Sequence, residues 1–305
     1  MIDVIIPVYN GANVIDQTLD ALLQQSQRGS IWQRILVVDD GSVDDTAERV
    51  SAYAAQGVEL LRAPHRSGRA NARNRGAQAS RAEWLLFLDA DCMPAHADLL
   101  SRYAALGTES DRVCLGRIEG RGPGFWQRFA VHVADGRERR AAAGDWLGFT
   151  SCNLCVSRRL FDAAGRFHPG YRHYGFEDRD LLVRLQAAGG RFVQDRSALV
   201  LHDVDTSVAE LCAKLRTAGE HSAAEFRQRF PDVYRHMPYA RFDVQTASMP
   251  IRIGAPLLAA IAPWAEAWAD RLLRSALPGD AIRRVVLRIA TALAYLQGTR
   301  RNFTQ

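Results

Sequence analysis

Two carboxylates separated by one residue follow an apolar run. Residues 85–88 are all hydrophobic, and Asp89, Ala90 and Asp91 come directly after them. Because side chains alternate along a strand, both acids would project to the same side where a buried strand emerges. Carboxylates that close repel each other unless a cation lies between them. Such hard oxygen ligands suit Mg²⁺ or Mn²⁺. We predict a divalent metal site here, with a solvated turn or a helix cap as the alternative.

A second pair of acids follows another apolar run. Asp39 and Asp40 come directly after residues 35–38. The carboxyl ends of parallel strands form the edge at which open α/β sheets bind ligands, and a carboxylate there can accept from ribose hydroxyls or from the imide N–H of a nucleotide base. We expect Asp39 to bind a nucleotide, whereas Asp40 fits a functional and a structural interpretation equally well.

The third acidic group lies after an aromatic, glycine-containing loop at residues 171–176. Glu177 and Asp178 come next, at the start of a predicted helix over residues 178–187, so one of these acids serves as a helix cap. Partial desolvation by the loop favours a carboxylate that can accept a proton, as a general base must. His202 ends a further predicted strand, and such a histidine is structural unless the fold brings it to a metal.

A short basic helix is predicted over residues 69–77, after the helix breakers Pro64 and Gly68. Arginines near the start of a helix can hold phosphates together with the exposed backbone N–H groups. Arg69 and Arg73 are the candidates for this role. A solvated basic face is the alternative interpretation.

The elements that must position these side chains form an α/β pattern. Short apolar runs alternate with helical patterns, which predicts a Rossmann-related, mostly parallel sheet flanked by helices. Four strands are predicted in the first part of the chain, over residues 2–8, 34–39, 58–62 and 84–88. Later strands are expected over 112–119, 149–156 and 198–201, and a helix over 97–106. Residues 120–145 match no pattern that we can assign.

Composition limits the class of protein. The chain has 305 residues, 48% of them hydrophobic, and a formal net charge of +5. Almost all of its positively charged side chains are arginines. The planar guanidinium group of arginine matches the geometry of a phosphate group, which fits an anionic ligand. No nucleic-acid-binding motif is present in the sequence. The apolar residues that follow Met1 leave no room for a signal segment, and five cysteines without disulfide-like spacing fit a reduced compartment. We expect a cytoplasmic protein, with attachment to the inner face of the membrane as the alternative.

The last hundred residues are predicted to form a helical extension, from residue 206 to 305. The apolar stretch 250–274 is interrupted by Pro256, Pro263 and two acids, so it does not span a membrane. The stretch 280–298 combines an apolar stripe with arginines. We favour packing of that stripe on a neighbouring helix, with peripheral contact to an anionic membrane as the alternative.

Taken in order, these motifs resemble the family 2 glycosyltransferases, which transfer sugars from nucleotide donors and have the GT-A fold. The resemblance covers about residues 1–205, which would form the catalytic domain. It implies that the end of the first strand lines the nucleotide, that Asp39 binds the base, and that the basic helix lies beside base and diphosphate. The implied donor-binding residues are Pro7, Val8, Tyr9, Asn10, Asp39, Gly68, Arg69, Arg73, Asn74, Asp89, Ala90 and Asp91.

The resemblance also assigns the remaining roles. Asp91 would coordinate the metal, with Asp89 nearer the ribose and the metal waters, and His202 would complete the metal shell. Asp178 would be the catalytic base, with Glu177 beside it. Asn153 and Phe176 would lie on the acceptor side.

The chemistry of the residues agrees with this assignment. A nucleotide diphosphate leaves readily only when its developing charge is neutralised, and the acceptor hydroxyl must lose its proton. No residue stands out as a covalent nucleophile, so inversion is expected. We favour a UDP-sugar donor, with GDP- and dTDP-sugars as alternatives. The acceptor is expected to be a hydroxyl group, either on a free molecule or on a lipid-linked one. Synthesis of bacterial-type surface polysaccharide, glycolipid or a related glycoconjugate is the expected setting.

Two rival functions remain. A nucleotidyltransferase would carry a glycine-rich loop with arginine and lysine after the first strand, and residues 10–13 lack these basic side chains. A non-catalytic protein that binds sugar nucleotides would tolerate the loss of Asp178. The Gln-x-x-Arg-Trp motif of processive synthases is absent from the sequence, which favours one transfer or a few over polymerisation.

Overall fold

The computed structural model describes residues 1–305 except 107–108, 203–205, 276–278 and 305. The chain forms two compact units. The first unit comprises residues 1–169 and 178–204, and the second comprises residues 170–177 and 205–305. The domain boundary expected after residue 205 lies at the edge of a stretch outside the described residues. Residues 170–177 belong to the second unit although residues of the first unit follow them in the chain.

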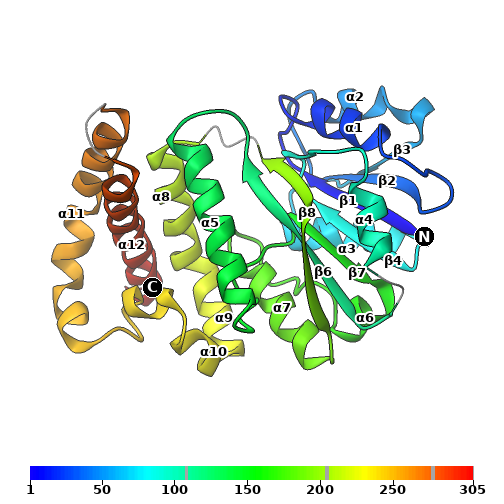
Figure 1. The fold of residues 1–305 in the computed structure, drawn as a ribbon. Coiled ribbons are helices and arrows are strands. Elements are labelled where there is room, and N and C mark those ends of the chain that lie inside the picture. The colour runs from blue at the N-terminus through cyan, green and yellow to red at the C-terminus, as the bar shows by residue number, and fades with distance from the viewer. Residues whose placement is uncertain (107–108, 203–205, 276–278, 305) are drawn as a thin grey trace. The chain divides into compact units, whose positions relative to one another are not determined.

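One eight-stranded sheet forms the first unit, in the order β3-β2-β1-β4-β7-β6-β8-β5 (Figure 1). Its first four strands pair in parallel, as predicted. Every residue of β1 is buried, because helices cover both faces, and this burial explains the continuous apolar run in the sequence. These strands are β1 (Ile2–Val8), β2 (Trp32–Asp39), β3 (Val58–Arg62) and β4 (Trp84–Leu88).

The other half of the sheet is mixed rather than parallel. β7 pairs antiparallel with both β4 and β6, and β8 pairs parallel with β6 and antiparallel with β5. The register places Cys92 opposite His202. The acid pair is therefore carried on the turn between β4 and β5, beside the end of β8. The strands are β5 (Cys92–Pro94), β6 (Arg112–Gly120), β7 (Asn153–Ser157) and β8 (Arg191–His202).

Helices of the first unit pack on this sheet at close range. In α1 the residues Ile15, Leu19 and Leu22 are fully buried in the core. In α3, Gly76 lies so near β1 that an added Cβ would be 2.4 Å from Cγ2 of Ile5. The helices are α1 (Ile15–Leu23), α2 (Thr46–Ser51), α3 (Arg69–Ala79), α4 (Leu99–Ala105), α5 (Phe125–Ala141), α6 (Arg158–Ala163) and α7 (Glu177–Ala187).

Helix α5 occupies the stretch for which the sequence showed no pattern. Only Phe125, Ala134 and Ala141 of its 17 residues are buried, so its apolar stripe is too thin to be recognised. Ion pairs attach α5 to the sheet instead. Arg117 of β6 is 8% exposed, and its guanidinium pairs with Asp135 at 2.8 Å and with Glu138 at 2.5 Å on the helix.

The second unit is helical, as expected. Ser207 begins it with a capping box to Glu210, and α8 runs into α9 through one π-helical turn (Ala218–Ser222). Pro256 and Pro263 lie inside α11 without ending it. None of the described helices is long and apolar enough to cross a membrane. The helices are α8 (Val208–Thr217), α9 (Ala223–Arg229), α10 (Pro231–Arg235), α11 (Met249–Arg274) and α12 (Asp280–Thr304).

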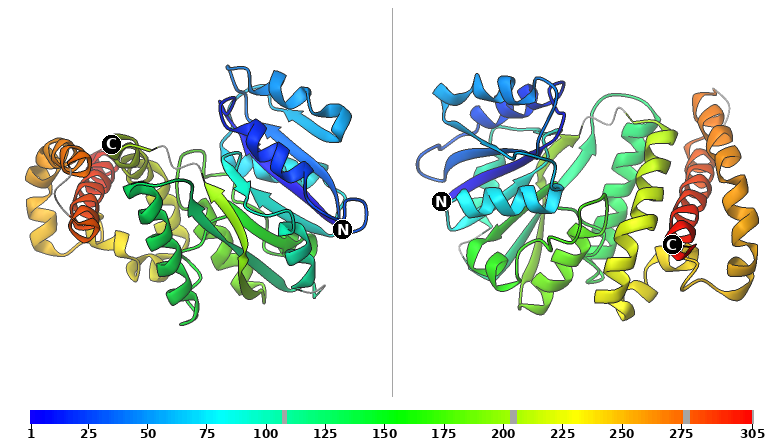
Figure 2. Two further views of the ribbon diagram at one scale, coloured as in Figure 1. Left: turned by 45° about the horizontal axis from the view of Figure 1, so that its top comes forward. Right: turned by 180° about the vertical axis from the view of Figure 1, so that it is seen from behind.

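Helices α11 and α12 run side by side as a hairpin, which Figure 2 shows from two directions. Gln297 of α12 donates from its side chain to the carbonyl oxygen of Ala259. Ala255, Ala259 and Leu296 are buried between the two helices together with Val244.

Residues 170–177 are bound to the other parts of the second unit. The Ser222 hydroxyl donates to the carbonyl oxygen of Tyr174 at 3.0 Å. The ring of Phe176 lies 5.2 Å from that of Phe226 and 5.5 Å from that of Tyr239. Phe176 is 2% exposed and has a φ of 69°, a backbone angle that non-glycine residues adopt only when their surroundings hold them there.

Candidate functional site

Asp39 ends β2 with one carboxylate oxygen in use and one available. The side chain is fully buried. Its Oδ1 accepts from the Ser42 N–H at 2.8 Å. Its Oδ2 lies 3.4 Å from Nε of Arg62 but receives no hydrogen bond from the described residues. A buried carboxylate oxygen in this state can accept from an entering N–H or hydroxyl group.

Asp40, which the sequence left undecided, has a structural role. It accepts from the backbone N–H and the hydroxyl of Ser67 and from the N–H of Gly68, the residue that precedes α3. Gly68 has a φ of 96°, which favours glycine. Asp40 thus fixes the direction in which the basic helix begins.

The end of β1 continues this edge. Pro7 and Val8 pair with β2, and Tyr9 is 38% exposed, with the Arg66 guanidinium 4.2 Å from its ring centre. Asn10 accepts from the Val43 N–H at 3.0 Å. The loops after β1 and β2 are therefore joined, and the Tyr9 ring remains partly accessible to a planar ligand.

Arg73 of α3 connects two of the predicted acids. It is 1% exposed, and its guanidinium lies 2.7 Å from Oδ1 of Asp89 and 3.7 Å from Oδ1 of Asp178. Burial raises the pKa of Asp89, but the charges of Arg73 and Arg69 and hydrogen bonds from Cys152 and Arg73 outweigh it and hold that pKa well below the usual range. Asp89 is thus an ionised carboxylate balanced from within the protein.

Asp91 and His202 form a pair of candidate metal ligands. Oδ2 of Asp91 lies 3.0 Å from Nε2 of His202, and the two side chains are 39% and 33% exposed. The loop that carries Asp91 is fixed by the Thr18 hydroxyl, which donates to the carbonyl oxygen of Ala90 at 2.8 Å. The pairing of β5 with β8 brings His202 to this place.

Cys92 lies in the same cluster, in which the ligand atoms of Asp91, Cys92 and His202 are all within 4.8 Å of one another. A hydrogen bond with Cys152 and burial both raise the pKa of the Cys92 thiol well above its usual value. Metals bind the thiolate, so this thiol would have to lose its proton before it could act as a ligand. Asp89 is not one of these three residues, and its contact with the metal stays a prediction.

Asp178 stands in the first turn of α7, with 14% of its side chain exposed. The hydroxyl of Ser151 donates to its Oδ1. Glu177, the first residue of α7, is 4% exposed. The site thus contains one carboxylate that a hydroxyl group orients, joined through Arg73 to the acid after β4.

The comparisons with known proteins agree with this geometry. The family model for glycosyl transferase family 2 matches residues 3–164, more than half of the chain. The chain belongs to glycosyl transferase family 2. This confirms the resemblance of the sequence motifs.

Two curated relatives illustrate the similarity. The chain is 30% identical over 244 residues to the pre-mycofactocin glycosyltransferase of Mycobacterium tuberculosis, a match that covers 76% of this chain and 48% of that protein. It is 30% identical over 214 residues to the amylovoran biosynthesis glycosyltransferase AmsB of Erwinia amylovora, covering 62% of this chain and 65% of that one. The chain thus spans about half the length of the first of these relatives.

Solved structures show the same GT-A fold. The mannosyltransferase PcManGT from Pyrobaculum calidifontis, in complex with GDP-Man and Mn²⁺, has a TM-score of 0.63 at 18% identity, covering 97% of this chain and 86% of that one. S. aureus TarS in complex with UDP-GlcNAc has a TM-score of 0.56 at 16% identity, covering 98% and 90%. The expected fold class is confirmed.

Two asparagines that were predicted to contact ligands are bound to protein groups in this structure. Asn153 is 1% exposed; its amide accepts from the Tyr103 hydroxyl at 2.6 Å and donates to two carbonyl oxygens within the sheet. Asn74 donates to the carbonyl oxygen of Phe167 at 2.8 Å and accepts from its N–H at 3.0 Å. Both side chains are satisfied by protein groups, which gives each a structural role; the acceptor and donor contacts expected of them stay predictions. Phe176, buried among aromatic rings, likewise offers no surface to an acceptor.

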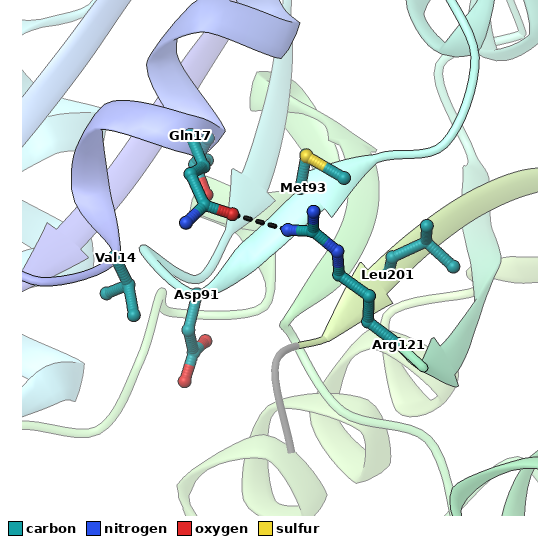
Figure 3. Close-up of a pocket in the computed structure, with 7 residues that line it drawn as sticks. Val14, Gln17, Asp91, Met93, Arg121 and Leu201 are labelled. Atoms are coloured by element: carbon teal, nitrogen blue, oxygen red, sulfur yellow. Dashed lines mark hydrogen bonds between the residues drawn. The ribbon is translucent and has the colours of Figure 1, made fainter. Parts of the chain in front are cut away.

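Some residues of the site were not found from the sequence. A small hollow beside Asp91 is bordered by the end of β6, where Arg121 reaches across to the Gln17 side chain on α1 (Figure 3). The Arg121 N–H donates to the carbonyl oxygen of His202 at 3.1 Å. The only available signal was an arginine directly after a predicted strand. Ser151 and Cys152 lie within the strand predicted over residues 149–156, where a serine and a cysteine do not by themselves indicate a site.

Proposed function

We propose that this chain transfers a sugar from a nucleotide-diphosphate donor to an acceptor hydroxyl, with inversion at the anomeric carbon. One observation carries the proposal: Arg73 holds Asp89, which follows β4, and Asp178, which begins α7, in a single buried cluster. This cluster joins the donor edge of the sheet to a carboxylate that can serve as the base. Residues 1–205 would carry the transfer, and residues 206–305 would have a packing, acceptor or membrane role.

In the proposed reaction the chain's own groups bind the donor and remove a proton. Oδ2 of Asp39 would accept the imide N–H of a uracil base, which favours a UDP-sugar; GDP- and dTDP-sugars also present N–H donors. Asp178 would take the proton of the acceptor hydroxyl while the Ser151 hydroxyl keeps its carboxylate oriented. The absence of a second carboxylate with a nucleophile's position among the predicted site residues supports inversion.

Asp91 and His202 would hold Mn²⁺ or Mg²⁺. Carboxylate oxygen and imidazole nitrogen are suitable donors, and both side chains are accessible enough for waters and phosphate oxygens to complete the coordination. When bound, the ion would stabilise the negative charge that develops on the departing diphosphate.

The biological setting is proposed from the relatives. AmsB acts in amylovoran biosynthesis by its name, and this supports a role in surface polysaccharide, glycolipid or related glycoconjugate synthesis. The five free cysteines support a cytoplasmic location. The acceptor would then be reached in the cytoplasm or at the inner face of the membrane.

A thermal-shift screen of nucleotides and nucleotide sugars, with and without Mn²⁺, tests the donor first, because a ligand that binds only the folded chain raises its melting temperature. Asp91→Ala should remove the metal-dependent part of the shift. Asp178→Asn should keep the shift and reduce transfer to the acceptor by about 100-fold or more. Asp162→Asn on α6, an exposed acid outside the site, is the matched control.

Three results would contradict the proposal. Unchanged turnover of Asp178→Asn would exclude this base. An equal Mn²⁺ effect in wild type and Asp91→Ala would exclude the metal site. Release of pyrophosphate from a nucleoside triphosphate and a sugar phosphate would favour a nucleotidyltransferase instead.

A further inference from the structure

Helix α11 is packed with its small side chains inward. Its buried residues are four alanines: Ala255, Ala259, Ala262 and Ala269. Six of its large apolar side chains face outward, with exposed fractions of 75% for Ile253, 69% for Leu257 and 78% for Trp264, while others such as Leu258 pack inward. A helix in a globular domain normally buries its large apolar residues. Here the sequence is arranged in the opposite way.

The outward side chains form one continuous stripe. They recur every three or four residues, which on an α-helix places them on one face. We call this set the α11 stripe: Met249, Ile253, Leu257, Ile261, Trp264 and Trp268. The helix has 26 residues, which corresponds to a length of about 39 Å. A contiguous apolar surface of this extent marks a binding site in soluble proteins.

The charges of α11 that have no ion pair among the described residues are both basic. Its two acids are paired, Glu266 with Arg216 of α8 at 2.9 Å and Asp270 with Arg274 at 2.9 Å. Arg252 and Arg271 are exposed near the two ends of the stripe. Tryptophan and arginine around an apolar strip are the composition of helices that lie in the interface of an anionic bilayer.

We propose that the α11 stripe lies on an anionic lipid bilayer, with the helix parallel to the membrane plane. The stripe would insert among the acyl chains near the head groups, and Arg252 and Arg271 would contact lipid phosphates. A second copy of the chain fits less well, because antiparallel stripes would place Arg252 of one copy near Arg271 of the other without an acid to neutralise them. The proposal does not depend on the proposed transfer reaction.

The experiment is sedimentation of the full chain with vesicles of phosphatidylglycerol and phosphatidylcholine, compared with vesicles of phosphatidylcholine alone. We expect partitioning into the anionic vesicles that weakens as salt is raised. Replacing both tryptophans, Trp264→Ser with Trp268→Ser, should lower the partition coefficient by at least about tenfold. Arg271→Gln should lower it by about fivefold on anionic vesicles only. Phe303→Ser, an aromatic that is 62% exposed at the other end of α12, is the matched control.

Circular dichroism and the melting temperature of each variant show whether it is folded; the substituted side chains are exposed, so both should match wild type. Equal partitioning of wild type and the tryptophan variant would overturn the proposal. A second result would also overturn it. If analytical ultracentrifugation shows a wild-type dimer and a monomeric tryptophan variant, and neither protein binds vesicles, the stripe joins two copies of the chain instead.

Discussion

Arg73→Met removes a positive charge that contacts both Asp89 and Asp178. The Arg73 guanidinium is 1% exposed and lies 2.7 Å from Oδ1 of Asp89, whose side chain is 14% exposed. Removing one partner of a buried ion pair costs about 3–5 kcal/mol, because the other charge stays buried without compensation. Arg69 retains part of the favourable charge at Asp89, so we expect a loss near the lower limit, about 3 kcal/mol in the free energy of unfolding.

The loss should depend on pH. In wild type the pKa of Asp89 is depressed, so this carboxylate stabilises the fold above its unfolded pKa of about 3.9, and that contribution fades as the pH falls further. In Arg73→Met burial dominates and the pKa of Asp89 rises. The variant must then either bury an unbalanced charge at pH 7 or bind a proton. The difference between wild type and variant should thus be largest near neutral pH and shrink toward pH 4.

Urea-induced unfolding at pH 7 and pH 4.5, followed by tryptophan fluorescence, measures both quantities. Arg49→Met is the matched control, because Arg49 pairs with Asp16 at 2.6 Å on the surface, with 47% of the arginine exposed. That change should cost less than about 1 kcal/mol at either pH. The reasoning is refuted if the two variants lose the same stability, or if the loss in Arg73→Met does not change with pH.

Two further predictions concern residues at strand ends, Asp39 at the end of β2 and Asn153 at the start of β7. Asp39→Asn should weaken nucleotide binding in isothermal titration calorimetry by about 10- to 100-fold, since a hydrogen bond to a charged group is worth about 1.5–3 kcal/mol; unchanged affinity would mean that the buried Oδ2 does not face the ligand. Asn153→Ala should lower the free energy of unfolding by about 1–3 kcal/mol, because the Tyr103 hydroxyl keeps only its longer bond to the backbone carbonyl oxygen of residue 153 and two carbonyl oxygens lose the side-chain amide donor. Its KM for the acceptor should stay at the wild-type value, and a raised KM with unchanged stability would support the acceptor-side role.

The parallel half of the sheet was predictable because burial on both faces leaves a direct mark on the sequence. β1, β3 and β4 begin and end at the predicted residues, and β2 begins only two residues earlier. Strand ends also fix where the acids gather, so Asp39, Asp89 and Asp91 could be assigned to one edge of the sheet from the sequence.

Long-range partners explain most of what the sequence did not reveal. The basic helix predicted either phosphate contact or a solvated face, but Arg73 points inward to acids that lie 16 and 105 positions later in the chain. Asn74 finds its partner 93 residues away. Whether such an amide or guanidinium group binds a ligand or another part of the protein depends on groups that are distant in the sequence. The local sequence pattern does not indicate which of the two occurs. Helix α5 was missed for a related reason, since ion pairs to β6 replace the apolar stripe.

The route of residues 170–177 has a consequence for how the protein is made. This segment leads directly into Asp178 but belongs to the second unit, where Phe176 packs on Phe226 and Tyr239. A polypeptide leaves the ribosome from its N-terminus, so those rings emerge well after every proposed site residue has been synthesised. The backbone in front of the proposed base is therefore fixed only after Phe226 and Tyr239 have left the ribosome, and a translation product interrupted before them would carry all the site residues in an unfinished arrangement.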